Sequence, residues 1–359
     1  MGCARGVRQV SICVQGRTRL VAAILALLVL AVAVAAYFGG WKAAHRWFSK
    51  ETCGWIVRGE VTLDRDLLDC GERGLRIAPF AVLDCAGHEI RGRGPGTSSE
   101  GLRLNGVTKA EVRNCRVSGF ARGVRIRGGS ENRIIGNRIE GNERGIDVAG
   151  KTSEGTSEGH VLQGNEIRDS AKDAIHLGGS ARVTVHENVI QRADGEGLSV
   201  ESCEACRVTA NTFSDTKEAA IDVKSSSRGV YEDNVIRGAM IKVRGASIGN
   251  VFTDNELFDS GFVFAAEVPR AEKGASGAPR APRDNRVVGG QVLAPKVCFR
   301  FTGASDNRVE GVAVRCRRTS EERPSGTLAA ERNTVDVREL GDPQSPPRAK
   351  RAAERERAG

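Results

Sequence analysis

The sequence predicts an all-β solenoid, in which short strands repeat along the chain and stack on one another. An Asn-x-hydrophobic triplet recurs at steps of 28, 23, 23, 23 and 21 residues, and a period in this range is typical of repeat architectures. An apolar pair separated by one residue recurs in the same register, as in Ile146/Val148 and Ile221/Val223, which is the alternation of a strand. The repeated asparagines are Asn137, Asn165, Asn188, Asn211, Asn234 and Asn255.

The repeat indicates one elongated domain, although the length of 359 residues alone would allow two or three. A single coil cannot bury its own inward face, so coils stack and like residues lie above like residues. We therefore expect the six asparagines to form a structural ladder in which each side chain hydrogen-bonds its neighbours.

The segment Val82 to Ile90, with the sequence Val-Leu-Asp-Cys-Ala-Gly-His-Glu-Ile, looks like the first coil of a known family. Together with the repeat, it resembles the right-handed parallel β-helix family, which includes pectate-lyase-like proteins and other extracytoplasmic β-helix repeat proteins. The resemblance covers the chain from about Cys53 to Val337. It implies a right-handed parallel β-helix of roughly ten coils, with a cap over its first coil.

The N-terminus predicts a membrane anchor. Residues 1–19 carry arginines and no acid, and residues 20–38 are uncharged and apolar. Nineteen helical residues at about 1.5 Å each nearly span a hydrocarbon core of ~30 Å. The basic flank favours a cytoplasmic N-terminus, so the β-helix would be periplasmic or extracellular. The alternative is a secreted protein after signal cleavage, because small-x-small motifs lie at Ala31–Ala33 and Ala33–Ala35.

The remaining boundaries follow from composition. We expect a juxtamembrane spacer at 39–52, the cap at 53–80 and β-helix repeats at 81–340, with a flexible insertion at 267–284 and a disordered charged tail at 341–359. A disulfide between Cys53 and Cys70 would staple the cap. The C-x-x-C of Cys203 and Cys206 falls in a turn, where either a disulfide or two inert thiols would fit.

The octapeptide from Gly145 to Thr152 matches the phosphate-binding P-loop pattern. That motif functions only where a glycine loop precedes a helix, whereas Ile146 and Val148 here are an inward strand pair. We therefore expect no nucleotide. With 4% aromatic residues and no zinc or calcium signature, we also expect no nucleic acid, metal or cofactor.

The outward face of the strands that carry the apolar pairs is the candidate functional surface. The residue between each pair points outward, because side chains alternate across a strand. We call these residues the outward row: Arg103, Arg125, Asp147, His176, Ser199, Asp222, Lys242, Val263 and Arg300. Asp147, His176, Asp222 and Lys242 are candidate catalytic residues, since carboxylate, imidazole and amine groups transfer protons. Arg103, Arg125, Ser199 and Arg300 are candidate ligand-binding residues.

Two functions are compatible with this surface. The first is binding of a polysaccharide or an envelope partner along the row, without catalysis. The alternative is a polysaccharide lyase or C5-epimerase acting on a uronate-containing glycan, as the family resemblance implies. The Asp-Pro-His-Asp motif of alginate epimerases and the clustered aspartates of calcium-dependent pectate lyases are missing from the sequence. Mixed charges are also ordinary on the solvent face of a strand, so the sequence leaves open whether the protein is an enzyme.

Overall fold

The computed structural model describes residues 52–94, 98–150, 155–267, 280–324 and 330–341. The chain divides into two compact units, Met1–Thr52 and Cys53–Gly359, and the fold described is that of the second. The expected anchor at 20–38 and its basic flank at 1–19 lie outside the described residues, as do most of the insertion and the tail. No helix within the described ranges is long and apolar enough to cross a membrane.

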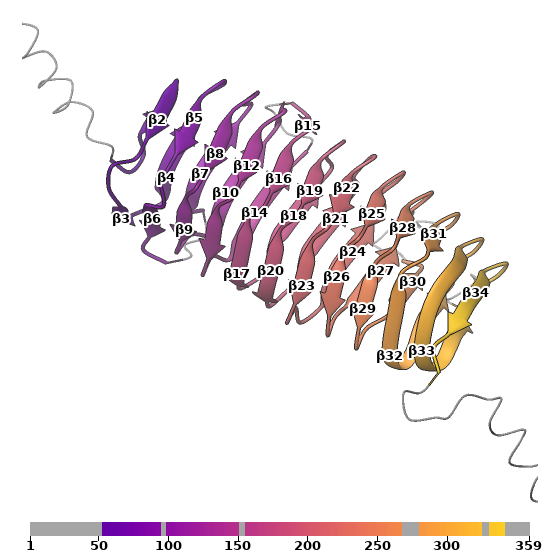
Figure 1. Cartoon of the computed structure of the whole chain (residues 1–359). Coiled ribbons are helices and arrows are strands. Elements are labelled where there is room, and N and C mark those ends of the chain that lie inside the picture. Colours follow the sequence, from indigo (N-terminus) through magenta and orange to yellow (C-terminus); the bar gives the residue numbers. More distant parts are fainter. Residues whose placement is uncertain (1–51, 95–97, 151–154, 268–279, 325–329, 342–359) are drawn as a thin grey trace, which may run out of the picture. The chain divides into compact units, whose positions relative to one another are not determined.

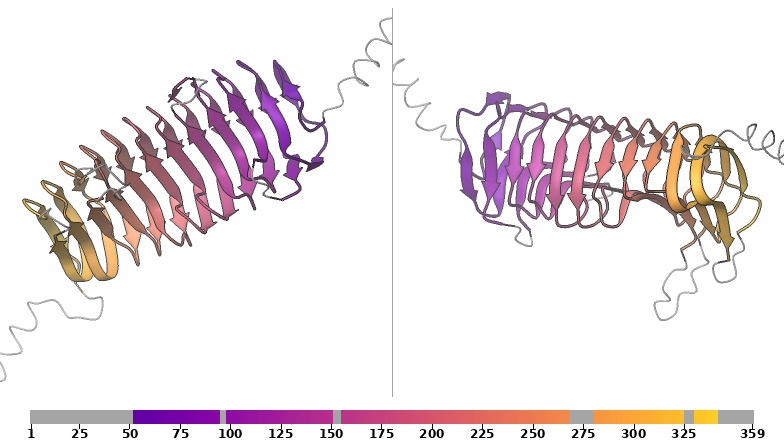
Figure 2. Two further views of the ribbon diagram at one scale, coloured as in Figure 1. Left: turned by 180° about the vertical axis from the view of Figure 1, so that it is seen from behind. Right: turned by 60° about the horizontal axis from the view of Figure 1, so that its bottom comes forward.

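The second unit is a right-handed parallel β-solenoid of about eleven turns (Figure 1). Each turn places one short strand in each of three parallel sheets, and each strand pairs with its counterpart in the next turn, as the two views of Figure 2 also show. Sheet I contains β2 (Glu60–Thr62), β5 (Val82–Asp84), β8 (Glu111–Arg113), β12 (Arg133–Ile135), β16 (Val161–Gln163), β19 (Thr184–His186), β22 (Arg207–Thr209), β25 (Val230–Glu232), β28 (Val251–Thr253) and β31 (Arg286–Val288).

Sheet II follows sheet I within each turn. It contains β3 (Leu67–Cys70), β6 (Glu89–Gly92), β9 (Arg116–Ser118), β13 (Arg138–Glu140), β17 (Glu166–Ser170), β20 (Val189–Ala193), β23 (Thr212–Ser214), β26 (Val235–Arg237) and β29 (Glu256–Phe258). Sheet III completes the turn. It contains β1 (Ile56–Val57), β4 (Arg73–Ile77), β7 (Glu100–Asn105), β10 (Arg122–Arg127), β14 (Arg144–Ala149), β18 (Ile175–Gly178), β21 (Leu198–Glu201), β24 (Ala219–Lys224), β27 (Met240–Arg244) and β30 (Phe262–Ala265).

The last strands continue through the corners between sheets. β32 (Gln291–Thr302) passes from sheet II into sheet III, β33 (Arg308–Arg323) passes through all three sheets, and β34 (Thr334–Glu339) belongs to sheets I and II. A separate two-stranded sheet, β11 (Gly129–Ser130) with β15 (Ser157–Glu158), lies at a corner. Residues 53–80, which the sequence analysis assigns to a cap, include β1 to β4 and already pair in register with the following turn.

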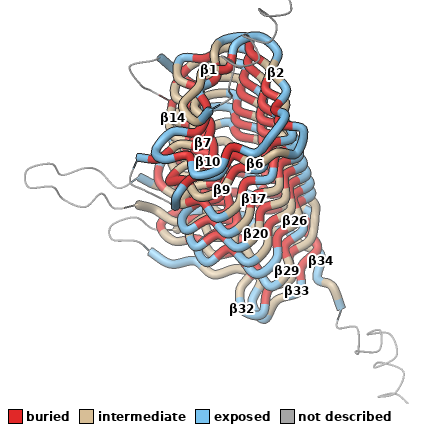
Figure 3. Tube along the Cα trace, turned by 90° about the vertical axis from the view of Figure 1, so that its left-hand side faces the viewer, coloured by how far each residue is buried: buried red, intermediate tan, exposed pale blue. Residues whose placement is uncertain are grey.

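The interior is a continuous apolar core. Figure 3 marks the buried residues in red along the stacked turns. Its side chains stack in columns, because alternation turns every second strand residue inward. The stack is aliphatic in the first turns and aromatic in the later ones. Tyr231 stacks on Phe252 with ring centroids 4.6 Å apart, and Phe264 stacks on Phe301 at 5.1 Å.

The predicted asparagine ladder is present at the corner between sheets I and II. Each Asn from 137 to 234 donates its side-chain N–H to the side-chain oxygen of the next Asn, at 2.9 to 3.0 Å. The same oxygen accepts the backbone N–H of the preceding Asn, as Asn188 does for Asn165 at 2.9 Å. The ladder therefore satisfies the polar backbone where the chain leaves the sheet.

The residue before each ladder Asn adopts a left-handed backbone conformation, with φ between 49° and 61°. Glycine occupies this position at Gly136 and Gly164, where the missing Cβ removes the steric cost. A second ladder lies at the corner between sheets III and I, where Asn250, Asn285, Asn307 and Asn333 hydrogen-bond in series. Asn132 occupies the same corner near the start of the stack.

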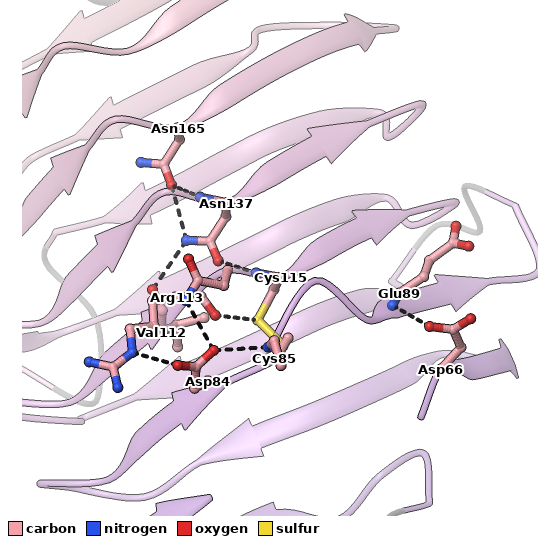
Figure 4. The surroundings of a disulfide bond; sticks show 11 residues. Asp66, Asp84, Cys85, Glu89, Val112, Arg113, Cys115, Asn137 and Asn165 are labelled. Carbon is pink, nitrogen blue, oxygen red and sulfur yellow. Dashed lines mark hydrogen bonds and ion pairs between the residues drawn. A yellow bond between two sulfur atoms is a disulfide. The ribbon is translucent and has the colours of Figure 1, made fainter. Parts of the chain in front are cut away.

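Four disulfides lie within the described residues. They join Cys53 to Cys70, Cys85 to Cys115, Cys203 to Cys206, and Cys298 to Cys316. The first and third join the pairs that the sequence analysis considers. Figure 4 shows the second disulfide beside the start of the asparagine ladder, where the backbone N–H of Cys115 donates to Asn137 at 2.9 Å.

Candidate functional face

The structure places the outward row on sheet III in unbroken register. Arg103 pairs with Arg125, Arg125 with Asp147, and Asp147 with His176. His176 pairs with Ser199, Ser199 with Asp222, and Asp222 with Lys242. Val263 and then Arg300 complete the row. Every predicted site residue on this face therefore lies in one column, one strand from the next.

Asp147 is the centre of an arginine cluster. It is 4% exposed, and Arg122 Nε donates a hydrogen bond to its Oδ2 at 2.9 Å. Arg125 Nε lies 3.8 Å from the same oxygen, and Arg144 Nη1 lies 3.7 Å from Oδ1. Burial, with the positive charge of Arg122 next in importance, lowers the pKa of Arg125. Three guanidinium groups therefore surround this carboxylate.

Asp222 is also enclosed. It is fully buried, and Arg244 Nε donates to its two carboxylate oxygens at 2.8 and 2.9 Å. Arg244 Nη1 contacts Glu267 at 2.6 Å. The hydrogen bonds to Asp222 raise the pKa of Arg244. Arginines contact both carboxylates, and the catalytic role of Asp147 and Asp222 stays a prediction.

His176 retains access to solvent and lies beside two carboxyl groups, those of Asp173 and Glu196. Its side chain is 18% exposed, and its Nδ1 lies 3.8 Å from Asp173 Oδ2 without a hydrogen-bond partner. Burial and the nearby Arg144 lower the pKa of His176, which favours the neutral imidazole at neutral pH.

Glu196 and Asp173 lie beside this histidine on adjacent turns. Burial of Glu196 and a hydrogen bond between its carboxyl and that of Asp173 raise the pKa of Glu196. Arg144 is the nearest cation, with its Nε 3.4 Å from Asp173 Oδ2.

The sequence analysis missed Asp173 and Glu196. Each lies three residues before a row member, His176 and Ser199 respectively, at the corner that leads into sheet III. The signal was available as spacing, since Glu100, Arg122 and Arg144 hold the same position in earlier turns. This position carries charge in five consecutive turns, but it lies outside the strand alternation on which the prediction was based.

The remaining row members differ in their charge pairing. Arg103 Nε lies 3.3 Å from Glu100 Oε2, and Arg300 Nε lies 3.3 Å from Glu321 Oε2. Lys242 forms no side-chain hydrogen bond or ion pair within the described residues. Among those residues no group of three or more potential metal ligands comes together.

The P-loop-like segment belongs to this face. Its residues Gly145 to Ala149 lie in β14, and the N–H of Gly150 donates to Gly178 of the next turn. Lys151 and Thr152 lie outside the described residues. Residues 145–150 thus form backbone hydrogen bonds with the neighbouring turns, and they provide no glycine loop ahead of a helix.

The chain is similar to several solved structures. One is the catalytic unit of a thermostable GH87 alpha-1,3-glucanase from Streptomyces thermodiastaticus, with TM-score 0.59 and 14% identity over 81% of this chain and 62% of that one. Another is a periplasmic alginate epimerase, AlgG, in a double-mutant form, with TM-score 0.57 and 12% identity over 80% and 71%. A third is an endo-xylogalacturonan hydrolase from Aspergillus tubingensis, with TM-score 0.51 and 13% identity over 79% and 91%.

At these identities the likeness shows a shared fold. The chain covers less than two thirds of the glucanase catalytic units. No curated protein sequence matches the chain. A family model described as a right-handed beta helix region matches residues 67–157 and 100–257, which together exceed half of the chain. The repeat, the three-sheet solenoid and this match agree, and the chain belongs to the right-handed β-helix family.

Proposed function

We propose that the protein binds an acidic polysaccharide along the outward face of sheet III. The observation that carries the proposal is the outward row itself, nine residues in unbroken register on consecutive turns. At about 4.8 Å per strand the row extends for roughly 40 Å. A straight, open and polar surface of this length suits an extended chain better than a small molecule.

The charge of the face favours an anionic ligand. At its N-terminal end Arg76, Arg103 and Arg125 stand in register on adjacent strands, and Arg122 and Arg144 flank them. Glu100 and Asp147 are the neighbouring carboxylates on these strands, and both are already shared among several arginines. Guanidinium groups bind carboxylates in a bidentate geometry, so uronate groups would neutralise the excess.

The names of the structural relatives guide the choice of ligands to test. They are a glucanase, a xylogalacturonan hydrolase and an alginate epimerase. We further propose that residues 20–38 anchor the protein with the solenoid outside the cytoplasm. The four disulfides support this location, because disulfides persist in oxidising compartments.

Binding is tested with the full-length chain in mild detergent against alginate, polygalacturonate, hyaluronan, chondroitin and neutral dextran. We expect the acidic polymers to bind with an affinity that falls as salt is added, and dextran to bind weakly. Changing Arg76 and Arg103 to Gln should weaken binding about tenfold. The matched control changes Arg116 and Arg138, two registered arginines on sheet II. An equal loss in both variants, or no preference for acidic polymers, would refute the proposal.

A second candidate function is acid–base chemistry on the bound glycan, and His176 favours it. A neutral imidazole beside the carboxyl groups of Asp173 and Glu196 can remove the C5 proton of a uronate. Return of a proton to the opposite face of C5 gives an epimer, whereas cleavage of the C4–O bond with protonation of the departing oxygen gives an unsaturated uronate. Glu196, whose pKa is raised, would supply the proton in either case.

Catalysis is tested by incubating the same polymers with the protein. The readouts are unsaturated-uronate absorbance and proton NMR of the product. We expect product to disappear in His176→Ala and Glu196→Gln and to persist in His186→Ala, a histidine on sheet I. Unchanged polymer in every case leaves the binding function as the one that the face performs.

A further inference from the structure

A small cavity of about 150 Å³ lies at the C-terminal end of the outward row. Its lining includes the row members Val263 and Arg300, together with Met240, Asp259 and Lys296. It forms where β32 crosses the corner between sheets II and III, and the register of that strand shifts between Ala294 and Val297. A polymer bound along the row would therefore reach the cavity without leaving the face.

Two charged side chains at this cavity, Asp259 and Lys296, are exposed to solvent and accessible to a ligand. The side chains of Asp259 and Lys296 form no hydrogen bond or ion pair within the described residues. The lining of a larger surface cavity, of about 440 Å³ in earlier turns, includes two ion pairs. Arg192 Nε lies 2.6 Å from Asp169 Oδ1, and Lys217 Nζ lies 2.7 Å from Asp194 Oδ1.

The wall between these charges is apolar. Met240, Val263, Pro295 and Val297 contribute to it, and Val263 is the one apolar member of the outward row. A cavity of about 150 Å³ accommodates a group as large as benzene, which excludes a whole oligosaccharide but admits a substituent. Hydroxyl groups pressed against this wall would lose hydrogen bonds to water, whereas a methyl group gains from burial there.

We propose that this cavity binds the acetamido group of an N-acetylhexosamine within the glycan that occupies the face. An acetamide has an N–H donor, a carbonyl acceptor and a methyl group. The cavity offers a carboxylate, cationic side chains and an apolar wall to match them. The amide N–H donates to the Asp259 carboxylate, the carbonyl oxygen accepts from Lys296 or Arg300, and the methyl contacts Met240 and Val263. This assignment rests on the proposed function and narrows it to glycans in which uronate and N-acetylhexosamine residues occur together.

The test compares two probes that differ only at the substituent. Oligomers of N-acetylglucosamine and of glucose, equal in length and linkage, are titrated against the full-length chain in detergent. We expect the N-acetylated oligomer to bind about tenfold more tightly. Saturation-transfer NMR should show the acetyl methyl receiving more magnetisation than the ring protons.

The variant Asp259→Gly removes the acceptor at a residue with φ of 53°, a backbone conformation that glycine adopts without strain. It should abolish the difference between the two probes. The matched control is Asp215→Gly, at φ 56° in the same corner two turns earlier and outside the small cavity.

Equal binding of both probes, or an unchanged preference in Asp259→Gly, would overturn the assignment. Retained binding of alginate and polygalacturonate in the same preparation would then show that the proposed function stands and that only the acetamido site is wrong. Loss of binding to every polymer would instead refute the proposed function.

Discussion

At the scale of single residues, the face of sheet III contains two kinds of carboxylate, one in the outward row and one at the corner beside it, that look alike in the sequence. Asp222 is fully buried under Arg244, whereas Glu196 stays partly accessible and shares a hydrogen bond with Asp173. The difference depends on an arginine 22 residues away in the chain. Strand alternation predicts which way a side chain points, but it does not predict what folds over it from the next turn.

We expect Asp222→Ala to lower the free energy of unfolding by about 2 kcal/mol, because Arg244 then keeps only Glu267 as its partner. The measurement is the shift in urea midpoint. Asp194→Ala is the control, since it breaks an exposed ion pair with Lys217 and should cost less than about 1 kcal/mol. A loss of glycan binding or turnover at unchanged stability would instead give Asp222 a direct role.

His160 makes stability depend on pH. It is fully buried in the core, and its Nε2 has no hydrogen-bond partner. Burial lowers the pKa of His160 from 6.5 to about 4. The unfolded chain therefore binds the proton first, and stability falls as the pH drops from about 6.5 towards 4.

The expected loss at pH 5 is about 2 kcal/mol. His160→Asn should remove it, because an amide does not titrate and can accept the N–H of Asn132 that His160 Nδ1 accepts now. Urea midpoints at pH 7 and pH 5 measure the effect. An identical pH dependence in both proteins would assign the acid sensitivity to another group.

At the scale of elements, the asparagine ladder is a polar column in which each side chain hydrogen-bonds the asparagines of the turns before and after it. Asn188→Ala would leave both the backbone and side-chain N–H groups of Asn165 without their acceptor. We expect a loss of about 3 kcal/mol and faster hydrogen exchange at the Asn165 amide. Asn114→Gly, at an exposed corner outside the ladder, should cost under about 1 kcal/mol.

The columns were predictable because the recurring triplet, at steps of 21 to 28 residues, fixes which side chains stack. The ladder asparagines, the inward pairs and the outward row all follow from that repeat. The corners were less predictable. Asp173 and Glu196 lie there, as does the left-handed position occupied by Gly136, Glu187 and Asp233, whose residue types share no obvious pattern. The anchor at residues 20–38 stays a prediction, because it lies outside the described residues.

At the scale of the whole molecule, each turn contacts only its neighbours, so a local defect should stay local. The Cys53–Cys70 disulfide closes a segment with a sequence separation of 17 in the first turn. Replacing both cysteines by Ala should cost about 3 kcal/mol and expose the N-terminal turns to protease while the centre stays resistant. The control replaces Cys203 and Cys206, which are separated by only 3 residues and should cost less. Equal proteolysis along the chain would show that the solenoid unfolds as one unit.

Successive turns pair residue for residue along the outward row. Each turn therefore adds the same length to the stack. Deleting residues 189–211 would join Asn188 to Thr212, restore the Asn-x-hydrophobic triplet and remove Cys203 and Cys206 together. The shortened protein should fold and present His176 directly beside Asp222, with its face reduced by about 4.8 Å. The length of the face that we propose binds glycan is thus adjustable in steps of one turn.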